Sequence, residues 1–458
     1  MRTLLIALAA LSLSAADLPT KFRSAEGTDS SAGELRDWWK RYGDPQLDAL
    51  VAKGIAGNKD LQIAASRVIQ ARTSSRVTRA DQLPAVNSTG NVSRVRGGVN
   101  QGVIHAQSGS SLISAYETGV FQNGFDASWE LDFFGAKKNA TKAAVADANG
   151  TEEARRNVLL VVLSEICRNY MEVRGFDNRL AILRRNVALQ QDSLDLIRVR
   201  AEAGLATGLD VERQAALVAA SQASVPVLEA GRAEGVYKLA VLLGQTPGQL
   251  DSELKNVVKL PVPPAVISTG LPSELLVRRP DVREAQEAIV AQVARYGVSR
   301  ADLYPKIRLT GTMGRQAASV DGLTLGGGNF FSFGPSVSLP VFSGGRIKAN
   351  IALQDEKLQS AKLQYEAVVL ASMQDVQIAL TAYDREQERL RRLSESADAS
   401  RKAVELSQEL YSRGLADFLS VLDAQRSLLE TEALLEESRV AVVTDSVALF
   451  KALGGGWN

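Results

Sequence analysis

The sequence has very few of the side chains on which active sites and metal centres usually depend. Its 458 residues include one histidine, His105, and one cysteine, Cys167. A zinc site, a Cys–His nucleophile pair and a disulfide within the chain each need more of these residues than are present. No acid, base and nucleophile set is clustered either. The sequence therefore predicts no cofactor, no metal and no enzymatic activity.

An excess of charge of either sign is also missing. The 53 lysines and arginines are balanced by 52 aspartates and glutamates. This balance excludes the basic field that nucleic-acid-binding proteins use, so no nucleic-acid partner is expected. Aromatic residues make up 5% of the chain, which is little for a protein with one compact core. Ala, Leu, Gln, Glu, Arg and Ser dominate instead, a composition typical of long exposed helices.

Long hydrophobic runs are absent except for one short stretch at the start of the chain. Residues 1–16, MRTLLIALAALSLSAA, combine Arg2, an apolar stretch and the small residues Ser14 to Ala16. This pattern predicts a signal peptide that is too short to span a bilayer, with a buried N-terminal helix as the alternative. No other stretch approaches the roughly 18 apolar residues of a spanning helix. We therefore expect an exported protein that could enter a membrane only through strands.

Several blocks of the sequence occur twice, in the same order. They are RADQLP (79–84) with RADLYP (300–305), LDFFG (131–135) with LPVFSGG (339–345), and GLATGLDV (204–211) with GLADFLSV (414–421). The offsets are 221, 208 and 210 residues, and such self-similarity indicates a duplicated unit whose loops differ in length. The sequence predicts a first repeat at residues 17–258, a Pro-rich linker at 259–271 and a second repeat at 272–458.

Each repeat is predicted to contain a helix, two strands separated by a Gly/Ser-rich loop, and a long helical hairpin. The expected elements of the first repeat are a helix from about Pro45 to Leu83, strands 85–95 and 121–134, and a hairpin at 136–244. Those of the second repeat are a helix, strands 306–314 and 331–342, and a hairpin at 346–453. Helices of this length persist only by packing, which predicts an antiparallel coiled coil. Pro226 should kink or split the helix that contains it.

Apolar and polar residues alternate along the predicted strands. Phe125, Trp129 and Leu131 lie at odd positions, and Asp126 and Glu130 lie between them. Such alternation fits a sheet that covers a soluble core, and it also fits a strand of an outer-membrane barrel. We favour the barrel because no other segment offers a matching apolar surface. Four strands cannot close a barrel, so several chains must each contribute four. The residues expected to face lipid are Phe125, Trp129, Leu131, Phe133, Phe331, Phe333, Val337 and Leu339.

Further blocks resemble a known family when they are taken together. They are DWWKRYGDPQLDALV (37–51), NKDLQIAASRVIQAR (58–72), SWELDFFG (128–135), GLPSELLVRRPDVREAQ (270–286), FGPSVSLPVFSGGR (333–346) and ALFKALGGGW (448–457). They resemble the TolC-type outer-membrane efflux factors, in particular the NodT-like branch that works with resistance–nodulation–division pumps.

The resemblance implies an α+β membrane protein that assembles as a homotrimer. Its twelve-stranded β-barrel would lie in outer-membrane lipid and continue into a periplasmic α-helical coiled-coil barrel. The implied partners are a periplasmic adaptor (membrane fusion) protein and an inner-membrane resistance–nodulation–division pump. Many members carry a lipid-accepting cysteine just after the signal segment. The stretch LSLSAADLP has none, so no N-terminal lipid anchor is expected.

The resemblance also assigns roles to residues of the two hairpins. The hairpin turns would contact the adaptor, through Gly204, Leu205, Ala206, Gly414, Leu415 and Ala416. Asp210 and Tyr411 match a hydrogen-bonded pair that locks the periplasmic gate, although Asp210 could instead complete a capping box with Thr207. Ala416 stands where the family's gate has an arginine, which predicts a weaker latch.

Asp423 matches an aspartate that lines the narrowest ring of the pore. A three-fold ring of carboxylates would bind cations and resist anions. The alternative is a surface carboxylate paired with Arg426 at i+3. Ser420 replaces the family's second acidic position, so the field of the ring should be reduced.

Together these features predict a passive exit duct, the outer-membrane channel of a tripartite efflux pump with a gated periplasmic end. A type I secretion duct on the same scaffold is one alternative. A periplasmic coiled-coil scaffold with a soluble β cap is another.

Overall fold

The computed structural model describes residues 35–99, 114–255, 259–263, 267, 274–325 and 328–457. The predicted signal peptide and His105 lie outside the described residues, as does part of the predicted linker. The chain divides into two compact units. We call them the helical unit (Met1–Val68, Gly150–Gln286 and Gln364–Asn458) and the sheet unit (Ile69–Asn149 and Glu287–Leu363).

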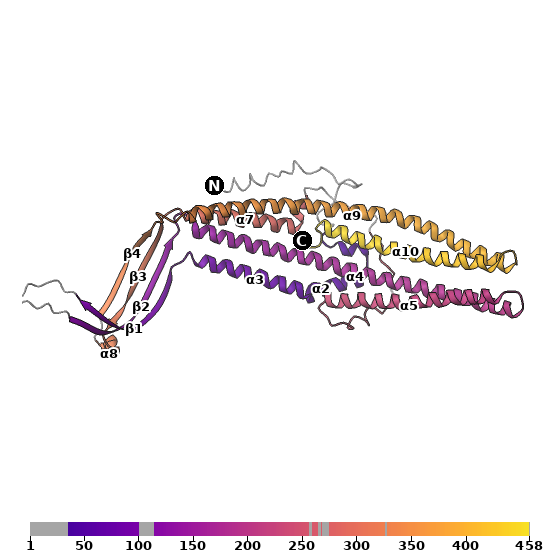
Figure 1. Ribbon diagram of the computed structural model, residues 1–458, viewed down its shortest axis with the longest axis horizontal. Helices are drawn as coiled ribbons and strands as arrows, with labels where there is room; N and C mark the ends of the chain where they lie inside the picture. Colours follow the sequence, from indigo (N-terminus) through magenta and orange to yellow (C-terminus); the bar gives the residue numbers. More distant parts are fainter. Residues whose placement is uncertain are drawn as a thin grey trace, which may run out of the picture. The chain divides into compact units, whose positions relative to one another are not determined.

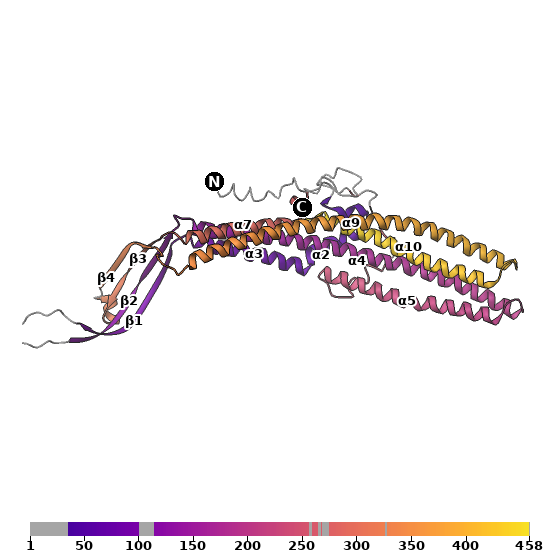
Figure 2. The ribbon, with the colours of Figure 1, turned by 45° about the horizontal axis from the view of Figure 1, so that its top comes forward.

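Two antiparallel helical hairpins make up most of the helical unit (Figures 1 and 2). The first consists of α4 (Ala136–Glu202) and α5 (Gly208–Leu242), and the second of α9 (Arg346–Ser412) and α10 (Phe418–Ala452). The N-terminal parts of α4 and α9, up to Asn149 and Leu363, belong to the sheet unit. We refer to these pairs as the first and second hairpin.

The largest apolar core of the helical unit includes residues of the two short helices η2 (Trp38–Tyr42) and α2 (Pro45–Gly57). The Trp38 ring is fully buried and stacks on Phe450 of α10, with 5.0 Å between ring centroids. On α4, Ile166, Tyr170 and Val173 enter the same cluster. These three positions follow the i, i+4, i+7 spacing of one helix face, which explains why that face of α4 is buried.

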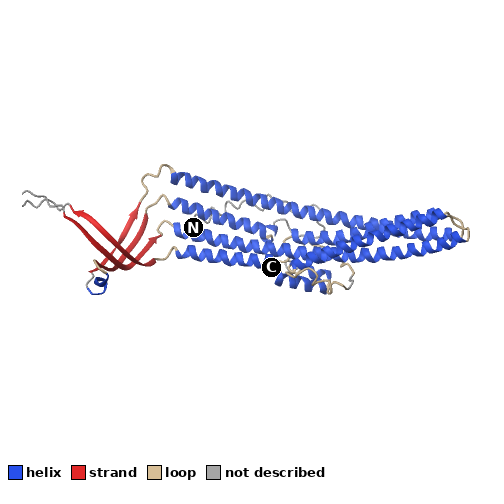
Figure 3. Cartoon of the chain, turned by 60° about the horizontal axis from the view of Figure 1, so that its bottom comes forward, coloured by secondary structure: helices blue, strands red, loops and turns tan. Residues whose placement is uncertain are grey.

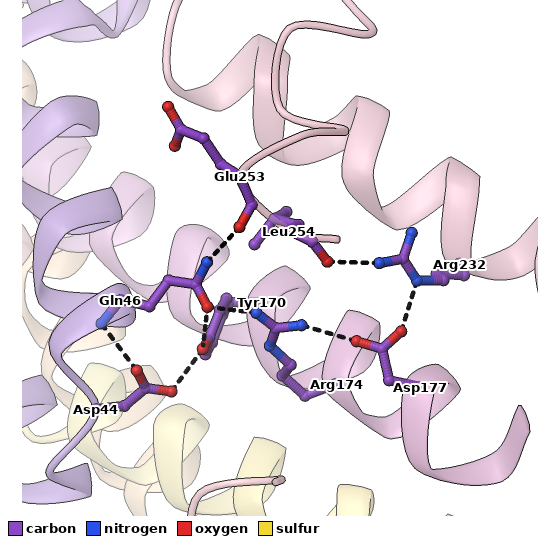
Figure 4. A network of polar contacts seen from close by, with 8 residues as sticks. All are labelled: Asp44, Gln46, Tyr170, Arg174, Asp177, Arg232, Glu253 and Leu254. Carbon is purple, nitrogen blue, oxygen red and sulfur yellow. Dashed lines mark hydrogen bonds and ion pairs between the residues drawn. The ribbon is translucent and has the colours of Figure 1, made fainter. Parts of the chain in front are cut away.

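A network of ion pairs around the buried Asp177 of α4 connects α4 with α5 (Figure 4). Arg174 Nη1 donates to Asp177 Oδ2 at 2.8 Å, and these side chains are 0% and 3% exposed. Arg232 of α5 donates from Nε to the other oxygen of Asp177 at 2.6 Å, and from Nη2 to the carbonyl of Leu254 at 2.7 Å. Asp177 therefore has both carboxylate oxygens hydrogen-bonded, as a buried charge requires.

The same network extends to the start of α2. Gln46 accepts from Arg174 and donates to the carbonyl of Glu253 at 2.8 Å. The Tyr170 hydroxyl donates to Asp44 Oδ2 at 2.5 Å, while Asp44 Oδ1 accepts from the Gln46 backbone N–H as the N-cap of α2. Asp44 therefore both caps α2 and accepts a hydrogen bond from Tyr170 of α4.

The helix expected from Pro45 to Leu83 is in fact two helices, α2 and α3 (Lys59–Ala80), which corrects the sequence prediction. The break lies at Asn58, whose backbone is extended. Its side chain accepts from the Leu61 N–H at 3.0 Å and donates to the Leu242 carbonyl at 2.8 Å. The cap of α3 is therefore also a contact with the end of α5, which no local pattern indicates.

The predicted split of the helix at Pro226 does not occur, because α5 continues from Gly208 to Leu242 with Pro226 inside it. A proline removes one backbone donor and costs about 3 kcal/mol in a helix interior. Buried residues on both sides of Pro226, such as Val218 and Val236, pack against neighbouring helices, and this packing offsets the cost.

Within the described residues the sheet unit contains four strands, red in Figure 3, and they are paired in the order in which they occur along the chain, as the labels of Figure 1 show. They are β1 (Ala85–Val99), β2 (Ser114–Leu131), β3 (Lys306–Ala317) and β4 (Gly328–Ser338), and all neighbours are antiparallel. The short helix α8 (Val320–Leu325) lies between β3 and β4 in the sequence, and α6 (Leu275–Arg278) and α7 (Pro280–Ala301) precede β3.

The strand ends differ from the predicted bounds. β1 and β3 continue beyond their predicted C-terminal ends, and β2 begins before its predicted first residue. Backbone pairing continues there through segments with no apolar alternation, as far as Val99 opposite Ser114. At the other end β2 stops at Leu131, where the Phe133 N–H turns back to the Leu131 carbonyl. β4 stops at Ser338, shortly before Pro340, which has no N–H to donate to a ladder.

We expect Asp177→Ala to destabilise the helical unit by about 3–5 kcal/mol, since it removes the buried carboxylate that balances the charge of the buried Arg174. The matched control is Asp398→Ala on α9, which removes an exposed partner of Arg401 and should cost at most about 1 kcal/mol. Thermal unfolding in detergent measures both. Equal shifts for the two variants would contradict the assignment.

Gly57→Ala should destabilise the protein by about 1–3 kcal/mol, because its Cβ would lie 2.3 Å from the Leu243 carbonyl oxygen. Gly208→Ala meets no atom within 4 Å and should be neutral or stabilise α5 by up to about 1 kcal/mol. The same unfolding experiment compares the two. A stabilising Gly57→Ala would show that α2 and α5 are not in close contact.

Candidate functional site

Both hairpin turns are built in the same way. Gly204 and Gly414 have φ angles of 74° and 75°, in the left-handed region that favours glycine. The Gly204 and Leu205 N–H groups donate to the carbonyls of Ala201 and Arg200, at 3.0 and 2.8 Å. Gly414 and Leu415 repeat this pattern, which is the Schellman motif. The motif ends α4 and α9 and reverses the chain.

The turns present one large apolar side chain each to solvent. Leu205 and Leu415 are 69% and 71% exposed. Ala206 is partly buried against the apolar cluster beside the turns, and Ala416 is also partly buried. The outermost residues of the turns are therefore Gly and Leu, and the alanines lie closer to the helices.

The first residues of the returning helices are capped by a hydroxyl–carboxylate pair in each hairpin. Thr207 and Asp210 form a capping box. The Asp210 N–H donates to Thr207 Oγ1 at 3.2 Å, and the Thr207 hydroxyl donates to Asp210 Oδ2 at 2.7 Å. In the second hairpin the types are exchanged, and Asp417 accepts from the Ser420 N–H and hydroxyl at 3.1 and 2.6 Å. Asp210 thus has the capping role that was one of its two predicted interpretations.

Hydrogen bonds from Ser420 hold the pKa of Asp417 below its ordinary value. A carboxyl whose pKa is lowered by folding contributes stability above its unfolded pKa and loses it as the pH falls through the folded value. The cap of α10 is therefore complete at neutral pH and weakens only under strongly acidic conditions.

Tyr411 lies in the second hairpin, against the end of α4. Its ring contacts Phe418 edge-on at 5.3 Å and lies under the Arg200 guanidinium at 4.6 Å. Its hydroxyl is buried and has no hydrogen-bond partner among the described residues. The Asp210 carboxylate is bonded to Thr207 instead, so a single chain does not bring the predicted pair together.

Asp423 is exposed on α10, although it directly follows the buried Leu422 in the sequence. Arg426 is exposed as well, and no ion pair between the two is found in the described part of the chain. The local alternative for Asp423, a pair with Arg426 at i+3, is therefore not present in the structure.

The strand register gives the sheet one apolar and one polar face. Residues paired directly across neighbouring strands share a face. The apolar face has rows such as Phe125–Met313–Phe331 and Leu131–Ile307–Val337. The opposite face has the rows Asp126–Thr312–Ser332 and Glu130–Arg308–Ser336. The alternation seen in the sequence is thus carried across β2, β3 and β4.

Most residues of the apolar face are exposed in the chain. Phe331 and Phe333 reach 78% and 81%, and Phe125, Trp129 and Val337 are exposed too, whereas Leu131 is partly buried. Phe133 and Leu339 are also exposed, but they lie beyond the ends of β2 and β4. These two therefore belong to the connections between strand and helix rather than to the strand rows.

Sequence reasoning missed the polar side chains that connect the two hairpins. Gln425 of α10 donates to Ser193 of α4 at 3.0 Å and accepts from Gln214 of α5 at 3.4 Å. Near the turn, Arg200 donates to the Tyr411 carbonyl at 3.5 Å. Buried glutamines on otherwise apolar helix faces were the available signal, but their partners lie more than 200 residues away.

The described residues contain neither a candidate metal site nor a helix suited to span a membrane. No group of three or more His, Cys, Asp or Glu side chains in these ranges is placed to hold a metal ion. The helices of the same residues include none with the length and apolar content needed to cross a membrane.

Comparison with known proteins places this architecture in a family. Residues 50–245 and 271–455 match the family described as outer membrane efflux protein. The pyoverdine export outer membrane protein OpmQ of Pseudomonas aeruginosa is 31% identical over 445 residues, covering 96% of this chain and 91% of that protein. The outer membrane protein OprJ of the same species is 32% identical over 447 residues, covering 95% and 89%.

A solved structure of the outer-membrane channel OprN has the same fold, with a TM-score of 0.84 at 30% sequence identity. The similarity covers 96% of this chain and 99% of that one. The resemblance to TolC-type efflux factors that the sequence motifs indicate is thereby confirmed. The chain belongs to the outer membrane efflux protein family and is a non-enzymatic efflux channel of the outer membrane that extends into the periplasm.

Proposed function

We propose that three copies of the chain form one duct, with a twelve-stranded barrel in the outer membrane. The sheet supports this arrangement, because within the described residues β1 and β4 each pair on one side only. An unpaired backbone group in lipid costs several kcal/mol, so such edges must pair with another copy. The number three is taken from the resemblance to TolC-type factors.

The two faces of the sheet would then separate lipid from lumen. The exposed apolar rows that contain Phe331 and Phe333 would face the hydrocarbon, because their side chains carry no charged group that would have to lose water. The polar rows line a watery interior, and Glu130 and Arg308 carry opposite charges there, 3.5 Å apart. The separation of the sheet into one apolar and one polar face is the single observation that supports the proposed membrane insertion.

The helical hairpins would continue the duct across the periplasm. α4 and α9 begin at Ala136 and Arg346, within a few residues of the ends of β2 and β4, so barrel and helices are linked by short connections. The turns, with the exposed Leu205 and Leu415, would contact a periplasmic adaptor, and the adaptor would connect the duct with an inner-membrane pump. The pump supplies the energy, and the duct itself is passive.

A ring of three Asp423 carboxylates would form the narrowest part of the closed periplasmic end. Its exposure and the absence of a pair with Arg426 in the described chain leave the carboxylate available to face a pore. Tyr411 would belong to the same gate, since its buried hydroxyl lacks a partner within the described residues. For a bond to Tyr411, Asp210 would have to leave Thr207, so this latch should be weak.

We also propose that the two hairpins and their preceding elements are tandem repeats, at residues 17–258 and 272–458. The two matching Schellman turns and the exchanged Thr207–Asp210 and Asp417–Ser420 caps support this duplication.

Phe333→Arg should strongly reduce the amount of assembled protein in the outer membrane. A lipid-facing arginine costs about 2–4 kcal/mol at the membrane midplane for each copy. The matched control is Ser332→Arg, one residue away on the polar face, which should assemble normally. Unheated electrophoresis of the membrane fraction measures a band of about three times the 49.1 kDa chain mass. Equal loss for both variants would remove the assignment of the faces.

Asp423→Ala should raise the single-channel conductance in planar bilayers and lower the preference for cations, because a ring of negative charge is removed from the constriction. Asp398→Ala removes an equivalent exposed charge from α9 and should leave both quantities unchanged. If Asp423→Ala behaves like this control, Asp423 is not part of the gate.

A further inference from the structure

The packing between the two hairpins changes character along their length. Beside the turns lies an apolar cluster, which we call the tip cluster: Leu194, Ile197, Leu217, Val218, Phe418, Val421 and Leu422. The larger core lies at the other end of the same helices and contains Val442 and Val443 of α10. Between the two, the buried residues of α10 include Gln425, Glu432 and Glu436. The middle of the contact is therefore polar.

Glu432 is the central residue of this polar section. Its side chain is 4% exposed, and it bonds to residues of two other helices, α4 and α9. Oε2 accepts from Asn186 Nδ2 of α4 at 3.0 Å, and Oε1 accepts from Arg401 Nε of α9 at 3.1 Å. Arg185 of α4 lies 3.9 Å from Oε1. One buried carboxylate of the second hairpin is thus bonded to its own hairpin and to the first.

The surroundings of Glu432 are loosely packed on two sides. A cavity of about 410 Å³ lies between α4, α5 and α10, with Leu183, Val227 and Leu429 in its wall. A second cavity of about 330 Å³ lies between α4, α9 and α10. Glu432 contributes to the walls of both. The bond from Asn186 to Glu432 is therefore a directional contact between the hairpins at a level that is bordered by two pockets.

We propose that Glu432 is a positioning residue of the periplasmic gate, which holds the second hairpin in its closed alignment against the first through Asn186. The proposal rests on the proposed gated duct, because Tyr411 and Asp423 lie on the second hairpin and Asp210 lies on the first. Loss of the Glu432–Asn186 bond lets the second hairpin shift relative to the first. The apolar side chains of the tip cluster make no directional bonds of their own, and the neighbouring bonds Gln425–Ser193 and Arg200–Tyr411 would have to shift with the hairpin.

The test combines conductance with a distance at the turns. Leu415→Cys, exposed at the second turn, is spin-labelled in the full-length protein, and double electron–electron resonance measures the separation between copies. The native Cys167 is fully buried, which also raises the pKa of its thiol, so labelling is directed to position 415. Single-channel conductance is recorded in planar bilayers for the same variants without the label.

Glu432→Leu should widen the distance distribution at the turns and raise the open fraction about tenfold or more, the change that a loss of about 1.4 kcal/mol produces. Asn186→Leu removes the Glu432–Asn186 bond and leaves Glu432 paired with Arg401. It should act in the same direction. Glu432→Gln keeps an acceptor oxygen of the same reach and should restore most of the closed population, which a merely structural role would not predict.

Asp398→Ala is the matched control, since it removes the other carboxylate partner of Arg401 and leaves the bond to Asn186 intact. Wild-type distances and conductance in both Glu432→Leu and Asn186→Leu would overturn the proposal. If Glu432→Leu does not assemble, Asn186→Leu decides alone. Absence of conductance from the wild-type protein and from every gate variant, Asp423→Ala included, would instead contradict the proposed duct, so the two failures are distinguishable.

Discussion

A sheet with an exposed apolar face and two unpaired edges is the constraint on which the rest of this protein depends. Neither feature is stable in a single chain, because water disfavours the face and lipid disfavours the edges. In the proposed assembly, β4 of one copy pairs with β1 of the next, lipid covers the apolar face and the polar face encloses a lumen. That proposal accounts for assembly, membrane insertion and the formation of a duct together.

The helical unit meets a different requirement, since helices of this length need partners along their whole extent. The structure satisfies it in two ways. Near η2 and α2, aromatic and aliphatic residues such as Trp38, Tyr170 and Phe450 pack densely around the Arg174–Asp177 pair. Further along the hairpins the contact between them is polar and bordered by pockets, and an apolar cluster follows beside the turns. This change of packing along the helices is consistent with the gate proposed at the turns.

Much of the fold could be predicted from local patterns. Alternation identified β2, β3 and β4, and helical spacing together with the lack of proline indicated the long helices. Glycines at 204 and 414 indicated the turns between them. The errors had physical causes. Strand ends were misplaced because ladders continue where alternation stops, and the break at Asn58 depends on a carbonyl of α5. Pro226 was expected to kink or split its helix, and the split does not occur because tertiary packing keeps α5 continuous.

The sequence by itself determined the class of protein, the two faces of the strands, the capped turns and the family, because these depend on residue order within short segments. Only the tertiary structure decided which distant residues meet. Asp44 with Tyr170, Asn58 with the end of α5, and Glu432 with Asn186 join positions 126 or more residues apart. Such contacts are selected by how helices pack, and a buried carboxylate gives no local sign of the partner that balances its charge.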